Sequence, residues 1–334
     1  MTESRLIPKL QKKNVVFITV KNRDYIRVSQ IERLISENAE KFAVYTSEKK
    51  NPFTRALDLN HRLRCGDISF SGADVIILGF LPQLIWKSVF NRLGEKGGKR
   101  PEVISDFFLS LYDTMVLDRK LIPEKSLSAG ILKKLDKRAL EGSDLVLTDT
   151  KADALFFAKT YGVPLSKFDT LYLEADERLY SSKGQGMAKK EALYFGTGLP
   201  LQGTEVVLDA FMKATEQDAD LSCVYIGGTG KIPAGKLTGI RQNPRIELIE
   251  WLSQEELAQR IAGTGVCLAG HFAPDIDKAD RTIPGKAYIF EAMGKPMILG
   301  ETRANRELFS EDERHFFVPR GDSEKLAECI LKSF

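Results

Sequence analysis

The sequence predicts an α/β protein made of two Rossmann-like, doubly wound domains that face each other across a cleft. Its length is the first observation, because 334 residues exceed one typical domain of about 100–200 residues and suit two of about 150–180. The second observation is the pattern of apolar residues. Short apolar segments of strand length alternate with longer segments of helical periodicity, as in parallel sheets whose strands are joined by crossover helices.

The first predicted domain spans residues 1–180 and begins with a buried strand at 14–20. The apolar face of the next helix is marked by Val28, Ile31, Leu34 and Ile35. We predict further strands at 42–45, 73–78, 102–106, 145–148 and 170–173, and a helix near 83–93. The tract 181–191 breaks the periodicity and is predicted to be the linker.

The second predicted domain, residues 192–334, repeats this alternation. Ser253 and Glu256 have the spacing of a capping box and mark the start of one helix. Other helices are predicted at about 204–214, from about Pro284, and after Asp322. The predicted strands lie at 192–196, 222–227, 246–249, 265–269 and 296–299.

Composition and charge exclude several classes of protein. With 43% hydrophobic and 28% charged residues, the chain is typical of globular proteins and not of disordered or fibrous ones. A net charge of +3 is too small for a nucleic-acid-binding surface, so no nucleic-acid partner is expected. The four cysteines form no CxxC pair, which argues against a zinc site or a disulfide framework. Since no segment has the character of a signal peptide or a membrane span, we expect a cytoplasmic protein.

Two glycine-rich segments follow strands of the second predicted domain. They are Gly196-Thr197-Gly198 and Gly227-Gly228-Thr229-Gly230. Open α/β sheets bind their ligands at the carboxyl ends of strands, which is where both segments are predicted to lie. Each segment by itself is equally compatible with a tight turn.

A third segment, Arg281-Thr282-Ile283-Pro284-Gly285-Lys286, joins two cations to a predicted helix start. Free backbone amides, the positive end of the helix dipole and both cations would converge there, which suits a diphosphate. A surface Lys and Arg beside an ordinary helix start explain the same residues. We expect the Lys286 side chain to be solvated and to contribute little to stability.

These motifs, taken in order, resemble the second domain of the bacterial GT-B glycosyltransferases of family 4, over most of residues 145–310. The resemblance includes the segment 290–296, Phe-Glu-Ala-Met-Gly-Lys-Pro. It implies that the second domain binds a nucleotide-sugar donor. The implied donor-binding residues are Gly196, Thr197, Gly198, Gln202, Gly228, Thr229, Arg281, Pro284, Gly285, Lys286 and Glu291.

The first domain resembles the same family more loosely, in the acceptor-side loop 105–114 and the interdomain strand 144–150. The resemblance implies that this domain binds the acceptor, a saccharide or a lipid-linked or protein-linked group. Asp106, Asp113 and Asp118 are candidates to orient the acceptor hydroxyl, although a single such Asp is usually a cap or turn residue. The candidate catalytic residues are Asp106, Asp113, His271 and Lys286, and a lone histidine such as His271 is more often structural.

The sequence departs from the family at two donor positions. Gln202 stands where the family usually has Lys, and the ribose-binding Glu, counted from Lys286, would fall at Ile289. Glu291 lies two residues later, a rotation of about 200° on a helix. Either the helix starts about half a turn later and brings Glu291 to the ribose, which is our interpretation, or Glu291 is not the ribose ligand.

The function implied by the resemblance is transfer of a sugar, with retention, from a nucleoside diphosphate to a hydroxyl in glycan or glycolipid assembly. A UDP-sugar is the preferred donor, with GDP- and dTDP-sugars as alternatives. No cofactor or metal is expected, because Lys286, Arg281 and helix amides would stabilise the leaving diphosphate.

Three other interpretations concern different partners. Gln202 and the displaced Glu291 fit a non-catalytic, nucleotide-binding partner subunit of a paired glycosyltransferase. A nicotinamide dehydrogenase is disfavoured because no GxGxxG follows the first strand. Residues 80–100, with Lys96 and Lys99, combine apolar side chains with cations, which suits peripheral contact with the inner face of a membrane. A buried crossover helix explains that tract equally well.

Overall fold

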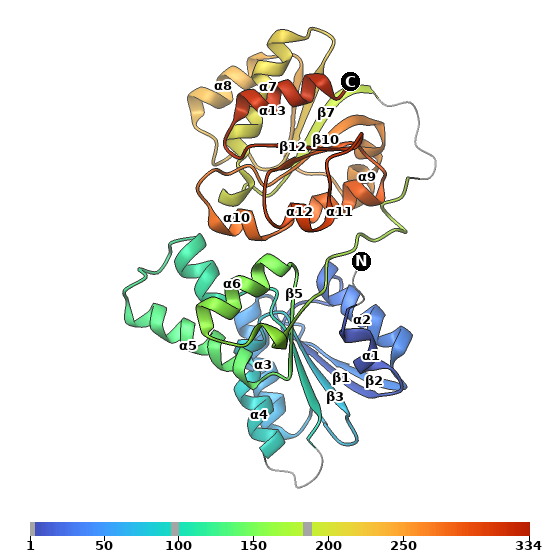
Figure 1. Cartoon of the computed structure of the whole chain (residues 1–334), viewed down its shortest axis with the longest axis vertical. Coiled ribbons are helices and arrows are strands. Elements are labelled where there is room, and N and C mark those ends of the chain that lie inside the picture. The colour runs from blue at the N-terminus through green and yellow to red at the C-terminus, as the bar shows by residue number, and fades with distance from the viewer. Residues whose placement is uncertain (1–3, 95–99, 183–188) are drawn as a thin grey trace. The chain divides into compact units, whose positions relative to one another are not determined.

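The computed structural model describes residues 4–94, 100–182 and 189–334, and it divides into two compact units, Met1–Leu173 and Glu174–Phe334 (Figure 1). Each unit contains a six-stranded sheet in which every pair of neighbouring strands is parallel. Helices cover both faces of each sheet (Figure 1). The predicted fold class, α/β with two Rossmann-like domains, is therefore confirmed.

The sheet of the first unit has the order β2-β1-β3-β4-β5-β6. Phe17 of β1 pairs in register with Val44 of β2 and with Ile77 of β3, so the direction of winding reverses between β1 and β3. The last strand starts two residues before the predicted one. The strands are β1 (Asn14–Thr19), β2 (Lys41–Tyr45), β3 (Val75–Gly79), β4 (Glu102–Asp106), β5 (Leu145–Thr148) and β6 (Phe168–Thr170).

The helices of the first unit include one predicted from its periodicity, α2 (Ile26–Asn38), whose four predicted core residues are all buried. Three longer helices escaped prediction although each begins at a side-chain cap: Asn51, Ser126 and Thr150 accept hydrogen bonds from backbone amides three residues on. These helices are α3 (Pro52–Cys65), α5 (Leu127–Gly142) and α6 (Lys151–Tyr161). The shorter elements are α1 (Leu6–Leu10), η1 (Pro82–Leu84), α4 (Trp86–Gly94), the π-helical η2 (Asp113–Asp118) and η3 (Leu165–Lys167).

The tract considered for membrane contact contributes to the core of the first unit. Ile85 and Val89 are fully buried, and Trp86 packs on Phe90 with ring centroids 4.8 Å apart. Lys96 and Lys99 lie outside the described residues. In its described part the tract is thus a crossover helix, and its apolar side chains are occupied in packing against the unit. None of the helices in the described ranges combines the length and apolarity needed to cross a bilayer.

The sheet of the second unit has the order β12-β11-β10-β7-β8-β9, the strand order of dinucleotide-binding Rossmann domains. Winding reverses between β7 and β10. The first strand of this sheet begins at Lys189, inside the tract predicted as the linker, of which residues 183–188 lie outside the described residues. The strands are β7 (Lys189–Phe195), β8 (Ser222–Ile226), β9 (Ile246–Ile249), β10 (Thr264–Gly270), β11 (Met297–Gly300) and β12 (His315–Val318).

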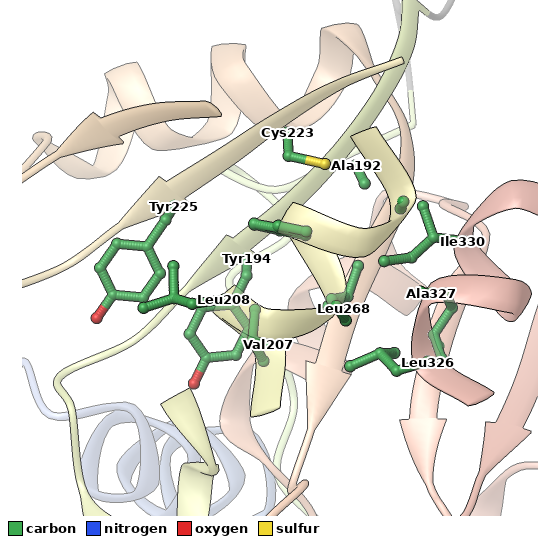
Figure 2. Packing of buried hydrophobic residues seen from close by; sticks show 14 of the residues in the cluster. Ala192, Tyr194, Val207, Leu208, Cys223, Tyr225, Leu268, Leu326, Ala327 and Ile330 are labelled. Atoms are coloured by element: carbon green, nitrogen blue, oxygen red, sulfur yellow. The ribbon is translucent and has the colours of Figure 1, made fainter. Parts of the chain in front are cut away.

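The core of the second unit lies between this sheet and two helices, α7 (Thr204–Gln217) and α13 (Ser323–Lys332) (Figure 2). The rings of Tyr194 and Tyr225 stack 5.7 Å apart at 13°, and Figure 2 shows both hydroxyls on the same side of the cluster. Leu208 from α7 and Leu326 from α13 are fully buried in it. Truncating such a leucine to alanine is expected to cost about 2–5 kcal/mol.

The remaining helices connect the strands. The predicted capping box is confirmed: Ser253 Oγ accepts from Glu256 N at 3.2 Å, and Glu256 Oε2 accepts from Ser253 N at 2.8 Å. It opens α9 (Gln254–Gly263). The others are η4 (Pro200–Gln202), α8 (Ala234–Gln242), α10 (Asp277–Arg281), α11 (Gly285–Ala292) and α12 (Asn305–Leu308).

Candidate functional site

Three loops meet at the carboxyl edge of the second sheet, beside the reversal between β7 and β10. Gly196, the first residue of the loop after β7, donates its backbone amide to Ile226 O at 2.9 Å. A Cβ at Gly227 would lie 2.2 Å from Gly196 O, so only glycine allows this approach. The loop after β10 touches the same edge, because Phe272 N donates to Gln202 O at 3.4 Å. The predicted glycine segments therefore share one edge of the sheet with His271.

Lys286 extends from the first turn of α11 onto the aromatic residues of β7. Its Nζ lies 3.7 Å from the ring centroid of Tyr194 and 5.6 Å from that of Phe195. The residue is 6% exposed, so the expected solvated side chain is wrong. Within the described residues Nζ has no hydrogen-bond partner. Burial holds the pKa of Lys286 well below its ordinary value of 10.5.

An unpaired buried ammonium is costly unless an acceptor reaches it. The neighbouring helix start is open to solvent, because Gly285 is exposed. The amides of Gly285 and Lys286 belong to the first turn, where intrahelical acceptors are missing. Together with the ammonium they offer donors to an anion, and a diphosphate has the charge and the oxygens to match them.

His271 lies directly after β10 and is 7% exposed. Burial, followed by the charges of Lys286, Arg320 and Lys278, lowers the pKa of His271 to about 3. The imidazole is therefore neutral at physiological pH, a form with one hydrogen-bond donor and one acceptor. In the described part of the chain its Nδ1 has no hydrogen-bond partner.

Two further cations, Lys231 and Arg320, lie at this edge, and the sequence analysis did not predict them as site residues. Lys231 is exposed and its Nζ donates to Gly198 O at 3.2 Å, which links the two glycine loops. Because Lys231 directly follows the glycine segment 227–230, the sequence could have indicated that it lies at this edge. Arg320 donates from Nη1 to Ala273 O and to Ile276 O, both at 3.0 Å. Only the pairing of β12 with β11 and of β11 with β10 brings Arg320 close to the loop after β10.

Other predicted donor-site residues are engaged elsewhere. Arg281 is 2% exposed, and its Nε donates to Asp277 Oδ2 at 2.7 Å, so this guanidinium is already paired. Gln202 Oε1 accepts from Leu199 N at 3.2 Å and closes the η4 turn. Thr229 lines a cavity of about 280 Å³ beside β9, together with Arg241, Ile246, Leu248 and Glu250. Gly228 O accepts from the Tyr225 hydroxyl at 3.4 Å.

The later helix start proposed for Glu291 is not observed. Helix α11 begins at Gly285, directly after its N-cap Pro284, and Glu291 lies about 140° around the helix from Lys286. Its carboxylate faces His315 Nε2 at 2.8 Å and Arg314 Nη2 at 3.4 Å. The geometry therefore assigns Glu291 to a contact with the end of the sheet and leaves it out of the site around Lys286.

The first unit buries two of its three predicted aspartates, Asp106 and Asp113, whereas Asp118 at the end of η2 is half-buried. Asp106 is fully buried, and its Oδ1 lies 2.9 Å from Arg27 Nε, a guanidinium that also donates to Leu171 O. Burial raises the pKa of Asp106, and the Arg27 charge opposes this rise. Asp113, 1% exposed, opens η2, and its amide donates to Ser110 Oγ at 2.9 Å. Asp106 is thus held in a structural ion pair instead of facing an acceptor.

A buried network that the sequence did not reveal anchors the loop predicted to contact the acceptor. Asp136 of α5 accepts hydrogen bonds from Ser110 Oγ at 2.8 Å, Tyr112 N at 2.8 Å and Tyr161 hydroxyl at 2.9 Å. A fourth bond comes from Leu111 N at 3.1 Å. Burial raises the pKa of Asp136 to about 6, although these four hydrogen bonds act to lower it. The network fixes the segment that precedes Asp113.

Aromatic rings gather at the carboxyl edge of the first sheet. Tyr25 and Phe108 both contact the ring of Phe80, with centroids 5.2 and 6.0 Å away. Lys21 Nζ lies 4.8 Å from the Tyr25 ring and 5.5 Å from that of Phe80. Phe80 and Leu81 have φ of 44° and 56°, values rare outside glycine that concentrate at functional sites.

The two parallel α/β sheets define a two-domain protein of the GT-B fold class. The match to a known family lies in the second unit: residues 189–334 match the family described as "Glycosyl transferases group 1". No curated protein sequence matches the chain. Among the described residues, no group of three or more His, Cys, Asp and Glu side chains is placed to hold a metal ion.

Solved structures with the same architecture cover nearly all of the chain. Sucrose-phosphate synthase from Thermosynechococcus elongatus is 12% identical, with a TM-score of 0.66, and the match covers 96% of this chain and 89% of that one. HepE from Anabaena in complex with UDP is 13% identical, with a TM-score of 0.65 and the same coverage of both chains. A glycosyltransferase from Rickettsia africae is 13% identical, with a TM-score of 0.63, covering 97% of this chain and 88% of that one. At these identities the likeness establishes the fold.

Proposed function

We propose that the protein is a glycosyltransferase whose second unit binds a nucleoside-diphosphate sugar and whose first unit binds the acceptor. The observation that carries the proposal is Lys286, whose buried amine has no hydrogen-bond partner among the described residues and lies at an open helix start where the winding of the sheet reverses. The match of residues 189–334 to group 1 glycosyl transferases supports it. HepE, which shares the fold, has been crystallised with UDP and with UDP-glucose, so a UDP-sugar is the preferred donor.

In this proposal the bond between the anomeric carbon and the diphosphate breaks while the acceptor oxygen bonds to that carbon, with retention of configuration. The proton of the acceptor hydroxyl passes to an oxygen of the departing diphosphate. Negative charge grows on the diphosphate as it leaves. Lys286, the amides of α11 and the cations Lys231 and Arg320 would stabilise that charge. Neutral His271 would supply a hydrogen bond beside them.

The acceptor would bind at the carboxyl edge of the first sheet. The half-buried rings of Tyr25 and Phe108, with Lys21 above Tyr25, offer a surface on which a saccharide can stack. The Asp136 network would position the loop that leads to Asp113. Glycan or glycolipid assembly in the cytoplasm is the setting that we propose for this reaction.

The second candidate is a non-catalytic, nucleotide-binding partner of another glycosyltransferase. Its support is that Gln202 closes a turn and that Glu291 faces His315 instead of the site. Both candidates require the nucleotide, and only the first requires turnover by the purified chain.

The experiment combines binding with turnover. A thermal-shift screen of UDP, GDP, dTDP and ADP identifies the base, since a ligand at 100 times its Kd adds roughly 2.7 kcal/mol to stability. Release of the selected diphosphate from its sugar is then followed with and without acceptors. Binding with release supports the enzyme, and binding without release for any sugar supports the partner subunit. If no diphosphate stabilises the folded chain, the proposed function is wrong.

A further inference from the structure

An apolar stripe runs along the solvent face of α5 in the first unit. Leu127, Ile131 and Leu135 are spaced four residues apart, so they share one face of the helix. They are 84%, 53% and 36% exposed, although large aliphatic side chains are among the residues most often buried. The opposite face carries Ala129, Asp136, Ala139 and Leu140, which are buried in the unit. Packing within this unit therefore does not account for the stripe.

Cations accompany the stripe along the same helix. Arg138 is exposed and lies within the stripe, about 20° around the helix from Leu127, while Lys134 and Lys137 are exposed on one flank. Lys137 lies 3.6 Å from Glu141, the acidic residue on this flank. The loop before the helix adds Leu121, 62% exposed, beside exposed Arg119 and Lys120. We call this set, Arg119–Leu121 with the outer face of α5, the α5 surface.

We propose that the α5 surface binds an anionic lipid bilayer, with the helix parallel to the membrane plane. An apolar stripe flanked by long cationic side chains can place its aliphatic groups among the acyl chains while the cations meet lipid headgroups. The positive charge of the α5 surface favours an anionic membrane over a second copy of this chain as the binding partner. A second copy of this chain would bring the same cations together, and that repulsion opposes self-association through this face. A negatively charged membrane complements both features of the surface.

The test is flotation of the full chain with vesicles of phosphatidylcholine alone or with about one third phosphatidylglycerol. We expect flotation with the anionic vesicles only, weakened by salt. Replacing three cations (K134Q, K137Q and R138Q together) should lower the apparent affinity by about fivefold per charge. Replacing the stripe (L127S, I131S and L135S together) should lower it by more than tenfold. W251S in the second unit, where Trp251 is 76% exposed, is the matched control and should float like the wild type.

Flotation does not depend on catalysis. The lipid-binding proposal is therefore tested independently of the proposed function. A wild-type chain that does not float with anionic vesicles overturns it, and so does a stripe variant that floats normally. If the triple stripe variant melts at a lower temperature, L127S alone carries the test, because Leu127 is the most exposed of the three residues. A dimer that the stripe variant dissociates, found by light scattering in the absence of flotation, overturns the lipid surface in favour of self-association.

Discussion

Both units bury a cation at the carboxyl edge of their sheet, and the two cations differ in their partners. In the first unit Arg27 meets Asp106 at 2.9 Å and also donates to a backbone carbonyl. In the second unit Lys286 lies on the ring of Tyr194 and has no hydrogen-bond partner among the described residues. A compensated buried charge belongs to the fold, whereas an uncompensated one is suited to an anion from outside. The comparison assigns Arg27 a structural role and supports the proposal that Lys286 receives a ligand.

The largest expected effect is on the stability of the first unit. Arg27→Met leaves the Asp106 carboxylate buried without its partner and should lower the free energy of unfolding by about 3–5 kcal/mol. Urea unfolding followed by circular dichroism measures it. Adding Asp106→Leu to the same chain should restore much of the loss, since no buried charge then remains. If R27M is as stable as the wild type, the pair does not hold this edge together.

The opposite pattern is expected for Lys286. Lys286→Met should reduce turnover by about 100- to 1000-fold, on the order of 3–4 kcal/mol, because the ammonium would act on charge that develops in the transition state. The same change should raise the melting temperature of the unliganded chain, since it removes a buried amine that has no hydrogen-bond partner among the described residues. Steady-state kinetics tests the expected loss of turnover, and thermal unfolding tests the expected rise in melting temperature. Near-normal turnover would remove Lys286 from the mechanism.

A smaller effect is expected at Asp136, which links α5 to the acceptor-side loop. Asp136→Asn should cost about 1–3 kcal/mol, because the amide cannot accept from all four donors. The pKa of Asp136 is raised to about 6 from 3.8, so the folded chain keeps a proton that the unfolded chain has released. Its contribution to stability therefore falls as pH rises from about 4 to 6. Urea unfolding across that range should show the stability of the wild type falling relative to that of D136N as pH rises, and a difference that does not change with pH would contradict the assignment.

The smallest predicted signal is spectroscopic and concerns His271. Its pKa is lowered to about 3, so the unfolded chain takes up a proton below about pH 6.5 that the folded chain refuses until about pH 3. The contribution to stability is complete above pH 6.5 and declines as pH falls through that window. With three histidines in the chain, an NMR titration should show one that stays neutral down to pH 4. In K286M the pKa of that histidine should rise, and three ordinary titrations in the wild type would refute the assignment.

Local patterns predicted much of the scaffold and little of the site's electrostatics. Periodicity located α2 and most strands, and the Ser253–Glu256 spacing located a helix start. The burial of Lys286 was not predictable, because its neighbour Tyr194 is distant in sequence and only the packing of α11 on the sheet brings the two together. Arg320 reaches the loop after β10 through the strand order, which no local motif encodes.

Two predictions could have been corrected from the sequence itself: the helices that were not predicted and the placement of Glu291. The caps Asn51, Ser126 and Thr150 marked three helices that periodicity had not indicated. Counting from Lys286 placed Ile289, and not Glu291, at the family's ribose position, and the structure gives Glu291 the partners His315 and Arg314 instead. The position of Glu291, two residues beyond the family's ribose-binding Glu, therefore indicated correctly that it faces elsewhere. The later helix start that we predicted to compensate for this shift was wrong.

Calorimetric titration of UDP into the wild type and into K286M, each in two buffers of different ionisation enthalpy, tests the central claim most directly. Lys286 has a pKa well below its ordinary value before binding, and a neighbouring diphosphate favours the charged form. The wild type should therefore bind UDP with net uptake of protons relative to K286M, which corrects for titration of the diphosphate itself. K286M should bind about tenfold more weakly or worse. Equal affinity and equal proton exchange in the two proteins would contradict the claim that Lys286 receives the diphosphate.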